Sequence, residues 1–269
     1  MDLGLKGRIA LVTGASKGIG KAIARGLARE GCSVALAART AAELAVAAEE
    51  IHTETGAQTL AVSADLTRTE DAKRMVARVI ERFGRLDILV NNAGAARGGV
   101  IEQLTDDDWE AALQLKFLGY VRSVRAALPH MRGQGGGRIV NLIGNDGVKP
   151  SYWEIAPGAA NAAGQNLTLS LAGQFGKENI TFVAVNPGPV RTERWDGLVR
   201  AMARDMRLSV EEAGRLAPRS IPLGRIAEPE EVADLVVFLA SERARFINGT
   251  MIEIDGGQQK AVMDALRNG

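Results

Sequence analysis

The sequence is poor in features that mark several classes of protein. It contains one cysteine, Cys32, in 269 residues, so a disulfide within the chain is excluded and a reducing compartment is expected. Aromatic residues make up only 4% of the chain, and 33 basic side chains are balanced by 32 acidic ones. The low aromatic content argues against a base-stacking surface. The balanced charge argues against electrostatic binding to nucleic acid or to an anionic membrane.

The chain also lacks long uncharged apolar segments. No such run reaches the roughly 18 residues of a membrane span. The segment before the first apolar run carries Asp2, Lys6 and Arg8 instead of a signal-peptide core and cleavage site. We therefore expect a cytoplasmic protein that binds no membrane. No His, Cys and Asp cluster has metal-ligand spacing, so no metal is expected, and the Gly-x-Ser-x-Gly turn of a hydrolase is missing.

What the sequence does contain is a regular alternation of short apolar runs and helical patterns. This alternation predicts an α/β protein with a parallel sheet covered on both faces, and the length suits one domain, 1–269. Segment 191–222 has no predicted strand, and its mixture of charged and apolar residues favours helices that form a substrate lid. The predicted strands are 8–13, 33–38, 59–63, 88–91, 138–143, 181–186 and 250–254, and the main predicted helices are 18–30, 41–55, 70–83, 107–131, 159–176 and 229–240.

A glycine-rich turn follows the first predicted strand. It reads Thr-Gly-Ala-Ser-Lys-Gly-Ile-Gly over 13–20. Glycines allow a tight turn and a close approach of the backbone to a pyrophosphate, and the start of the next helix offers free N–H groups and a positive dipole end. Because the turn lies between a strand and a helix, it predicts a dinucleotide site.

Three further motifs accompany this turn. They are Asn-Asn-Ala-Gly at 91–94, Asn-Pro-Gly-Pro-Val-Arg-Thr at 186–192 and Asp-Gly-Gly at 255–257. With three residues between Gly14 and Gly18, the chain resembles the short-chain dehydrogenase/reductase family over nearly its whole length. The resemblance implies a Rossmann-type, doubly wound, parallel seven-stranded sheet with helices on both faces. It also implies a homotetramer or homodimer, packed through helices 107–131 and 159–176.

The resemblance further implies where the cofactor lies. The family holds the adenine edge at the end of the third strand, the adenosine ribose at the turn 92–94, and the nicotinamide beside the turn at 187–188 with a hydroxyl contact from Thr192. The predicted cofactor-binding residues are Gly14, Ser16, Lys17, Gly18, Ile19, Gly20, Arg39, Asp65, Leu66, Asn91, Asn92, Ala93, Gly94, Pro187, Gly188, Val190 and Thr192.

Charge predicts the cofactor type. A carboxylate at the end of the second strand would bind the ribose 2′-hydroxyl of NAD, but this chain has Ala37, Ala38 and Arg39 there. Arg39 can stack on adenine and pair with a 2′-phosphate, and Lys17 can add a second positive charge. We therefore predict NADP(H) as cofactor. The alternative is that both are solvated surface cations.

The four residues that the family uses in catalysis are replaced. Seven residues after Trp109, where the family has asparagine, stands Lys116. The serine position holds Gly144, or Asn145 after a one-residue slip, the tyrosine position Pro157 and the lysine position Asn161. Proline has no proton to give, so the tyrosine-based chemistry of the family cannot operate at that position. The family name alone therefore does not make this chain a dehydrogenase.

The replaced positions suggest substitute groups. The asparagine position holds a lysine and the lysine position an asparagine, so a positive charge has moved between helices that the family places close together. Lys116, Asn161 and Tyr152, in a loop five residues before Pro157, are the candidate catalytic residues, and Asp146 is a weaker candidate. The alternatives are an ordinary helix-surface lysine and an aromatic residue that only packs.

Three functions are compatible with this sequence. The first is an atypical NADP-dependent oxidoreductase acting on a small, apolar carbonyl or alcohol substrate. The second is a nonenzymatic NADP(H)-binding sensor or partner subunit, favoured by the four replaced residues. The third is an isomerase or lyase that reuses the pocket without net hydride transfer.

Overall fold

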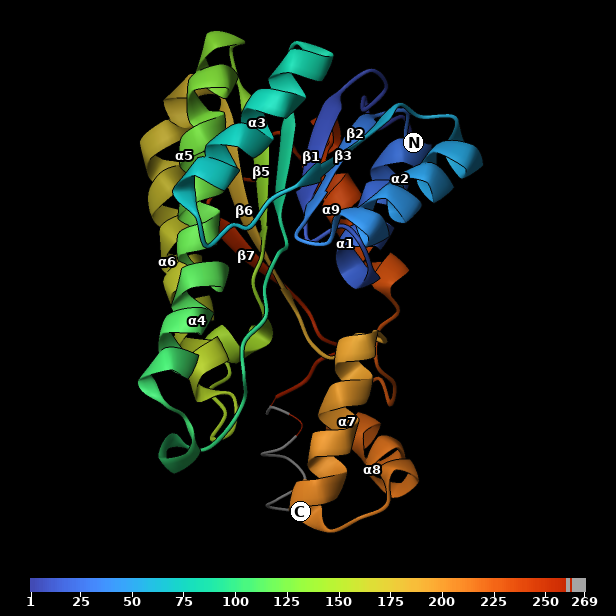
Figure 1. Ribbon diagram of the computed structural model, residues 1–269, viewed down its shortest axis with the longest axis vertical. Coiled ribbons are helices and arrows are strands. Elements are labelled where there is room, and N and C mark those ends of the chain that lie inside the picture. Colours follow the sequence, from blue (N-terminus) through green and yellow to red (C-terminus); the bar gives the residue numbers. More distant parts are fainter. Residues whose placement is uncertain (260–261, 263–269) are drawn as a thin grey trace.

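The computed structural model describes residues 1–259 and 262, and these form one seven-stranded parallel sheet in the order β3-β2-β1-β4-β5-β6-β7 (Figure 1). This is the strand order of a Rossmann fold with β7 added at one edge, so the predicted fold class is confirmed. The strands are β1 (Ile9–Thr13), β2 (Ser33–Ala38), β3 (Thr59–Ser63), β4 (Ile88–Asn91), β5 (Gly137–Leu142), β6 (Ile180–Pro187) and β7 (Thr250–Ile254).

Helices cover both faces of the sheet, with α1, α2 and α9 on one face and α3, α5 and α6 on the other (Figure 1). None of the helices formed by the described residues is long and apolar enough to cross a bilayer. The helices are α1 (Gly18–Arg29), α2 (Ala41–Thr55), α3 (Thr69–Phe83), α4 (Asp106–Lys116), α5 (Leu118–Gly133), α6 (Ile155–Phe175), α7 (Glu193–Met206), α8 (Val210–Leu216) and α9 (Pro229–Ala240), with short 3₁₀ turns η1 (Ile101–Gln103), η2 (Asn145–Gly147), η3 (Gly176–Glu178), η4 (Ala217–Ser220) and η5 (Glu242–Ala244).

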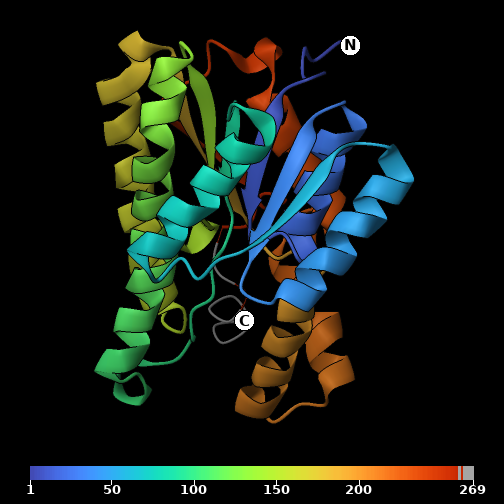
Figure 2. The ribbon, with the colours of Figure 1, turned by 45° about the horizontal axis from the view of Figure 1, so that its top comes forward.

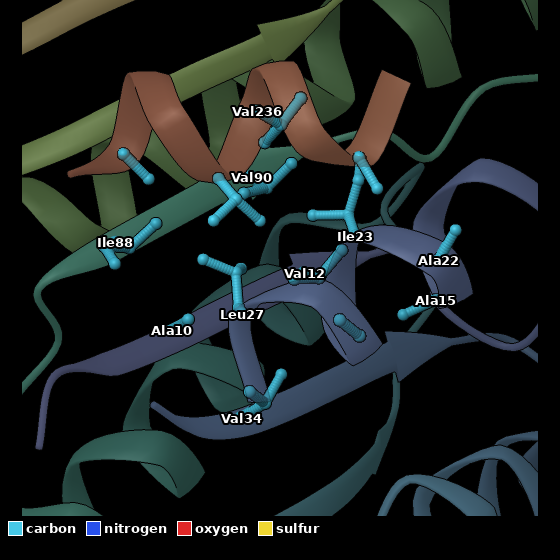
Figure 3. Packing of buried hydrophobic residues seen from close by; sticks show 14 of the residues in the cluster. Ala10, Val12, Ala15, Ala22, Ile23, Leu27, Val34, Ile88, Val90 and Val236 are labelled. Carbon is cyan, nitrogen blue, oxygen red and sulfur yellow. The ribbon is translucent and has the colours of Figure 1, made fainter. Parts of the chain in front are cut away.

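The core beneath α1 shows why the first strand and helix take their places. Ile23 and Leu27 are four residues apart on one face of α1, and both are fully buried against Val12 of β1 and Val236 of α9 (Figure 3). Burying each such side chain contributes about 1.5–3 kcal/mol. This packing fixes the start of α1 directly beyond the end of β1, where the glycine turn lies.

The predicted helix 107–131 is wrong in one respect, because it is two helices. The α-helix is interrupted at Phe117, whose φ of −111° and ψ of −64° depart from helical values near −63° and −42°. Lys116 is therefore the last residue of α4. The predicted helix 159–176 starts earlier, at Ile155, so that Pro157 lies in its first turn, where a missing N–H is tolerated.

Segment 191–222 forms α7, α8 and η4, which stand beyond the carboxyl ends of the strands, apart from the helices that flank the sheet (Figures 1 and 2). These elements have an apolar cluster of their own, centred on Trp195, Val199 and Met202. Met202 is fully buried, so it serves the packing of this unit. We call this part of the chain, residues 191–222, the lid unit.

Candidate active site

A cavity of about 740 Å³ lies at the carboxyl ends of the strands, between the sheet and the lid unit. Parallel α/β sheets bind ligands at this edge, because the connections to the helices diverge there. Most of the predicted cofactor-binding residues line it: Gly14, Ser16, Lys17, Gly18, Ile19, Gly20, Arg39, Leu66, Asn92, Ala93, Gly94, Pro187, Gly188, Val190 and Thr192.

The glycine turn leaves room for a ligand only because it has no side chains at its tightest points. A Cβ at Gly20 would lie 2.3 Å from the carbonyl oxygen of Gly14, and a Cβ at Gly14 would lie 2.9 Å from the Cα of Ala93. Gly14 also has a φ of +65°, which other residues rarely adopt. The Asn92 amide donates to the carbonyl oxygens of Thr13, at 2.9 Å, and Gly14, at 3.2 Å, and so holds this turn against β4.

Two residues predicted to bind the cofactor do not line the cavity. Asn91 is fully buried, pairs in register with Asn141 on β5, and donates to its side-chain oxygen at 2.8 Å. The Asp65 carboxylate accepts hydrogen bonds from the N–H and hydroxyl of Thr67, at 3.0 and 2.8 Å. Both side chains support the backbone around the cavity, because the strand and turn geometry directs them to protein partners.

The two predicted phosphate-binding cations have different surroundings. Lys17 pairs with Glu193, the first residue of α7, at 2.7 Å, and both side chains are exposed. This contact raises the pKa of Lys17 and lowers that of Glu193. Arg39 lines the same cavity and makes no ion pair with any described residue. Glu193 thus competes for the cation that the sequence assigns to a phosphate.

The inner end of the cavity contains Lys116, which is only 8% exposed. A Cβ at Gly94 would lie 3.1 Å from Cγ of Lys116, so the lysine stem packs against the third residue of the turn 92–94. Burial lowers the pKa of Lys116 to about 8, opposed by the charges of Asp146 and Glu154 and assisted by Arg194. The alternative of an ordinary surface lysine is therefore wrong.

Asn161 reaches the site through Asp146. Its amide donates to Oδ1 of Asp146 at 2.5 Å; Asp146 lines the cavity, whereas Asn161 is buried behind it. This pair fills the space beside Gly144, where a Cβ would lie 2.6 Å from Nδ2 of Asn161 and 2.7 Å from Oδ1 of Asp146. Gly144 has a φ of +146°, so a side chain there would be strained as well as crowded.

Tyr152 does not lie among the residues that line the cavity. It packs, half-buried, against the apolar cluster of the lid unit together with Trp153 and Leu198. Leu198 and Trp195 do line the cavity, so the lid unit contributes an apolar wall to it. Tyr152 thus holds the lid unit to the loop before α6.

Sequence reasoning did not identify four charged residues of the cavity, Glu43, Glu154, Glu193 and Arg194. Two of them, Glu154, which directly precedes α6, and Arg194, in the first turn of α7, come from different elements. Both act electrostatically on Lys116. No spacing rule links Glu154 to Arg194. The only feature in the sequence that could have indicated Arg194 is its position two residues after the motif 186–192. Among the described residues, no group of three or more His, Cys, Asp or Glu side chains could hold a metal ion.

Comparison with known proteins agrees with this geometry. A family model described as enoyl-(acyl carrier protein) reductase matches residues 14–259. The chain belongs to the short-chain dehydrogenase/reductase family. It is 35% identical to trans-4-hydroxycyclohexanecarboxylate dehydrogenase of Sinomonas cyclohexanicum, over 93% of this chain and 92% of the relative. It is 33% identical to 3-oxoacyl-(acyl carrier protein) reductase of Staphylococcus aureus, over 92% of this chain and 96% of the relative.

A solved structure is similarly close. L-sorbose reductase from Gluconobacter frateurii, in complex with NADPH and L-sorbose, is 35% identical and superimposes with a TM-score of 0.91, covering 97% of this chain and 100% of the reductase chain. Short-chain reductases with bound NADPH are therefore close structural neighbours of this protein.

Proposed function

We propose that this protein is an NADP(H)-dependent oxidoreductase for a small carbonyl or alcohol substrate, in which Lys116, positioned by Asp146 and Asn161, takes the role of proton donor. The observation that carries the proposal is the burial of Lys116 in the cavity with a pKa of about 8. A group titrating near the working pH can both give and accept a proton.

The residues present suit NADP(H). The crowded glycine turn allows a close approach to a pyrophosphate, Arg39 makes no ion pair with a described residue, and residues 187–190 line the same cavity. The NADPH complex of the similar L-sorbose reductase supports the same assignment. When bound, NADPH supplies the hydride, and everything else in the reaction is left to the chain's own residues.

Lys116 supplies the proton in this proposal. Below pH 8 its ammonium group donates a proton to the carbonyl oxygen of the substrate as that oxygen gains negative charge. In the reverse direction the neutral amine accepts the proton of an alcohol. The Asp146 carboxylate favours the charged amine, and the Asn161 amide fixes the position of Asp146. Asp146 and Asn161 are positioning residues.

The lid unit encloses the substrate in this proposal. Trp195 and Leu198 give an apolar wall to the cavity that also contains Lys116. Such a wall excludes water from the reacting atoms and strengthens the electrostatic effect of Lys116. It favours a substrate with an apolar body.

The test is NADPH oxidation with a panel of small ketones, compared between the unmodified protein, Lys116→Gln and Tyr152→Phe. We expect Lys116→Gln to lose at least about 100-fold in kcat with NADPH affinity kept, because acid–base groups typically contribute that much. Lys73→Gln, an exposed lysine on α3, is the matched control. If Tyr152→Phe lost all activity while Lys116→Gln kept full activity, the proton donor would be Tyr152.

A second measurement separates positioning from packing. Asp146→Asn removes a charge that raises the pKa of Lys116. The pH at which reduction falls to half should therefore move below its value near 8, whereas a purely structural defect would lower kcat without moving that pH. Asp107→Asn, at the exposed start of α4, is the control.

One observation favours a second candidate, a nonenzymatic NADP(H)-binding protein. Gly144 carries no hydroxyl that could orient a carbonyl, and the space for one is filled by Asn161 and Asp146. NADPH binding without turnover of any ketone or alcohol in the panel would support this candidate over the enzyme.

A further inference from the structure

A second cavity, of about 440 Å³, lies at the amino ends of the strands, opposite the end of the sheet that holds the first cavity. Its walls come from segments that are distant in sequence: the approaches to β1 and β4, the start of β5, and the connection from α9 to β7. Its volume is within the range of sites for small molecules. No part of it belongs to the cofactor and substrate cavity.

Four arginines and two carboxylates line this cavity, so positive charge is in excess. Both carboxylate oxygens of Asp87 already have partners, because they accept hydrogen bonds from the N–H of Ile9 at 2.9 Å, from Arg8 at 3.1 Å and from Arg85 at 2.5 Å. Glu242 accepts from Arg8 at 2.8 Å. Arg245, exposed at the rim, makes no ion pair with any described residue.

Arg138 is the most buried of the four arginines, and the only hydrogen bonds that its side chain makes with described residues go to the backbone carbonyl oxygens of Gly137, at 3.3 Å, and Asn179, at 3.4 Å. Its side chain is 11% exposed, and its nearest carboxylate oxygen, on Glu242, is 3.8 Å away. Its Nε is buried and has no hydrogen-bond partner. Burial lowers the pKa of Arg138. An unpaired buried guanidinium nitrogen is costly, and an anion in the cavity would compensate it.

The rim adds an aromatic ring. Phe246 lines the cavity and is 100% exposed, although large apolar side chains usually find cover. It follows Arg245 in the sequence, and both exposed residues line the cavity, so a cation and an aromatic ring are available to one ligand. Guanidinium groups bind phosphate, and planar bases stack on aromatic rings.

We propose that this cavity binds a nucleoside phosphate, with the phosphate on Arg138 and Arg245 and the base on Phe246. Because it lies at the other end of the sheet, the site is separate from the cofactor and does not depend on the proposed oxidoreductase activity. Phosphate recognition by several guanidinium groups explains the excess charge, and stacking explains the exposed ring.

The experiment measures thermal unfolding of the protein with saturating NADPH, so that the cofactor site is filled, while AMP, ribose 5-phosphate or inorganic phosphate is titrated at constant ionic strength. AMP should raise the midpoint saturably, and ribose 5-phosphate should do so more weakly. Arg245→Gln should weaken the apparent affinity for both about tenfold, as expected for one charged hydrogen-bonding group. Phe246→Ala should reduce AMP to the level of ribose 5-phosphate and leave ribose 5-phosphate unchanged.

Arg78→Gln, which removes an exposed arginine from α3, is the matched control and should behave like the unmodified protein. Both main variants alter exposed side chains, so folding should be kept. The proposal is overturned if AMP does not raise the midpoint or if Arg245→Gln responds like the control. It is also overturned if inorganic phosphate alone matches AMP, because the ring would then have no role.

Discussion

Lys116 shows how strongly a single residue depends on its surroundings in this protein. In water its amine would keep the usual pKa of about 10.4, but the fold leaves the residue only 8% exposed. Burial disfavours the charged form and lowers the pKa to about 8, and the nearby carboxylates reverse only part of this effect. The same burial that suits the amine to proton transfer makes it a burden on stability.

The destabilisation caused by burying Lys116 can be measured. Between pH 8 and about 10.5 the unfolded chain binds a proton at Lys116 that the folded protein does not, so the free energy of unfolding should rise with pH across this interval. Below pH 8 the charge is present in both states and costs on the order of 3 kcal/mol. Lys116→Met should therefore be more stable than the unmodified protein at pH 7, and the difference should shrink towards pH 10.5. Chemical denaturation at both pH values checks this.

Lys73→Met is the control for this measurement, because it removes an exposed lysine of similar size. Its stability difference should be small and should not follow the same pH dependence. A Lys116→Met variant that is less stable at pH 7 would mean that the lysine is better paired than its burial indicates.

At the scale of elements, the contact between the glycine turn and the lid unit carries a consequence for cofactor binding. Lys17 and Glu193 join these two parts across the mouth of the cavity. A 2′-phosphate would have to compete with the Glu193 carboxylate for Lys17. The ion pair is exposed, so each partner contributes little to stability and can exchange.

Glu193→Gln should consequently increase the affinity for NADPH, by a few-fold, while the affinity for NADH stays the same. Fluorescence titration with both cofactors measures this. In the same assay the unmodified protein should prefer NADPH by more than tenfold, and Arg39→Asp should reverse the preference, because a carboxylate repels phosphate and can bind a 2′-hydroxyl. Equal gains for both cofactors in Glu193→Gln would mean that the effect comes from loosening the lid unit.

At the scale of the whole molecule, we predict a homotetramer or homodimer. The surface of α6 bears Gly173, with open space above it, and the exposed apolar side chain of Leu169, which would permit a close helix contact with a second copy. Light scattering at micromolar concentration measures the mass directly. A single species of about 28.5 kDa, the mass of one chain, would contradict the prediction.

The sequence alone determined the fold class and the cofactor turn, and it predicts that the usual catalytic side chains of the family are replaced. These conclusions rest on local information. Alternating patterns predict the strands and helices, and the tight turn at 13–20 requires glycine whatever surrounds it. Spacing also proposed Lys116 and Asn161 as catalytic candidates, and only the structure shows the hydrogen bond from Asn161 to Asp146.

Only the tertiary structure decided how the side chains meet. Asn91 was assigned to the cofactor but turns to Asn141, because strand register sets its direction. Tyr152 was proposed as an acid but packs with the lid unit. The second cavity brings Arg8 and Arg138 together from segments 130 positions apart, and no local pattern encodes such a meeting. Burial and charge pairing are properties of the assembled sheet, which is why they could not be read from the chain.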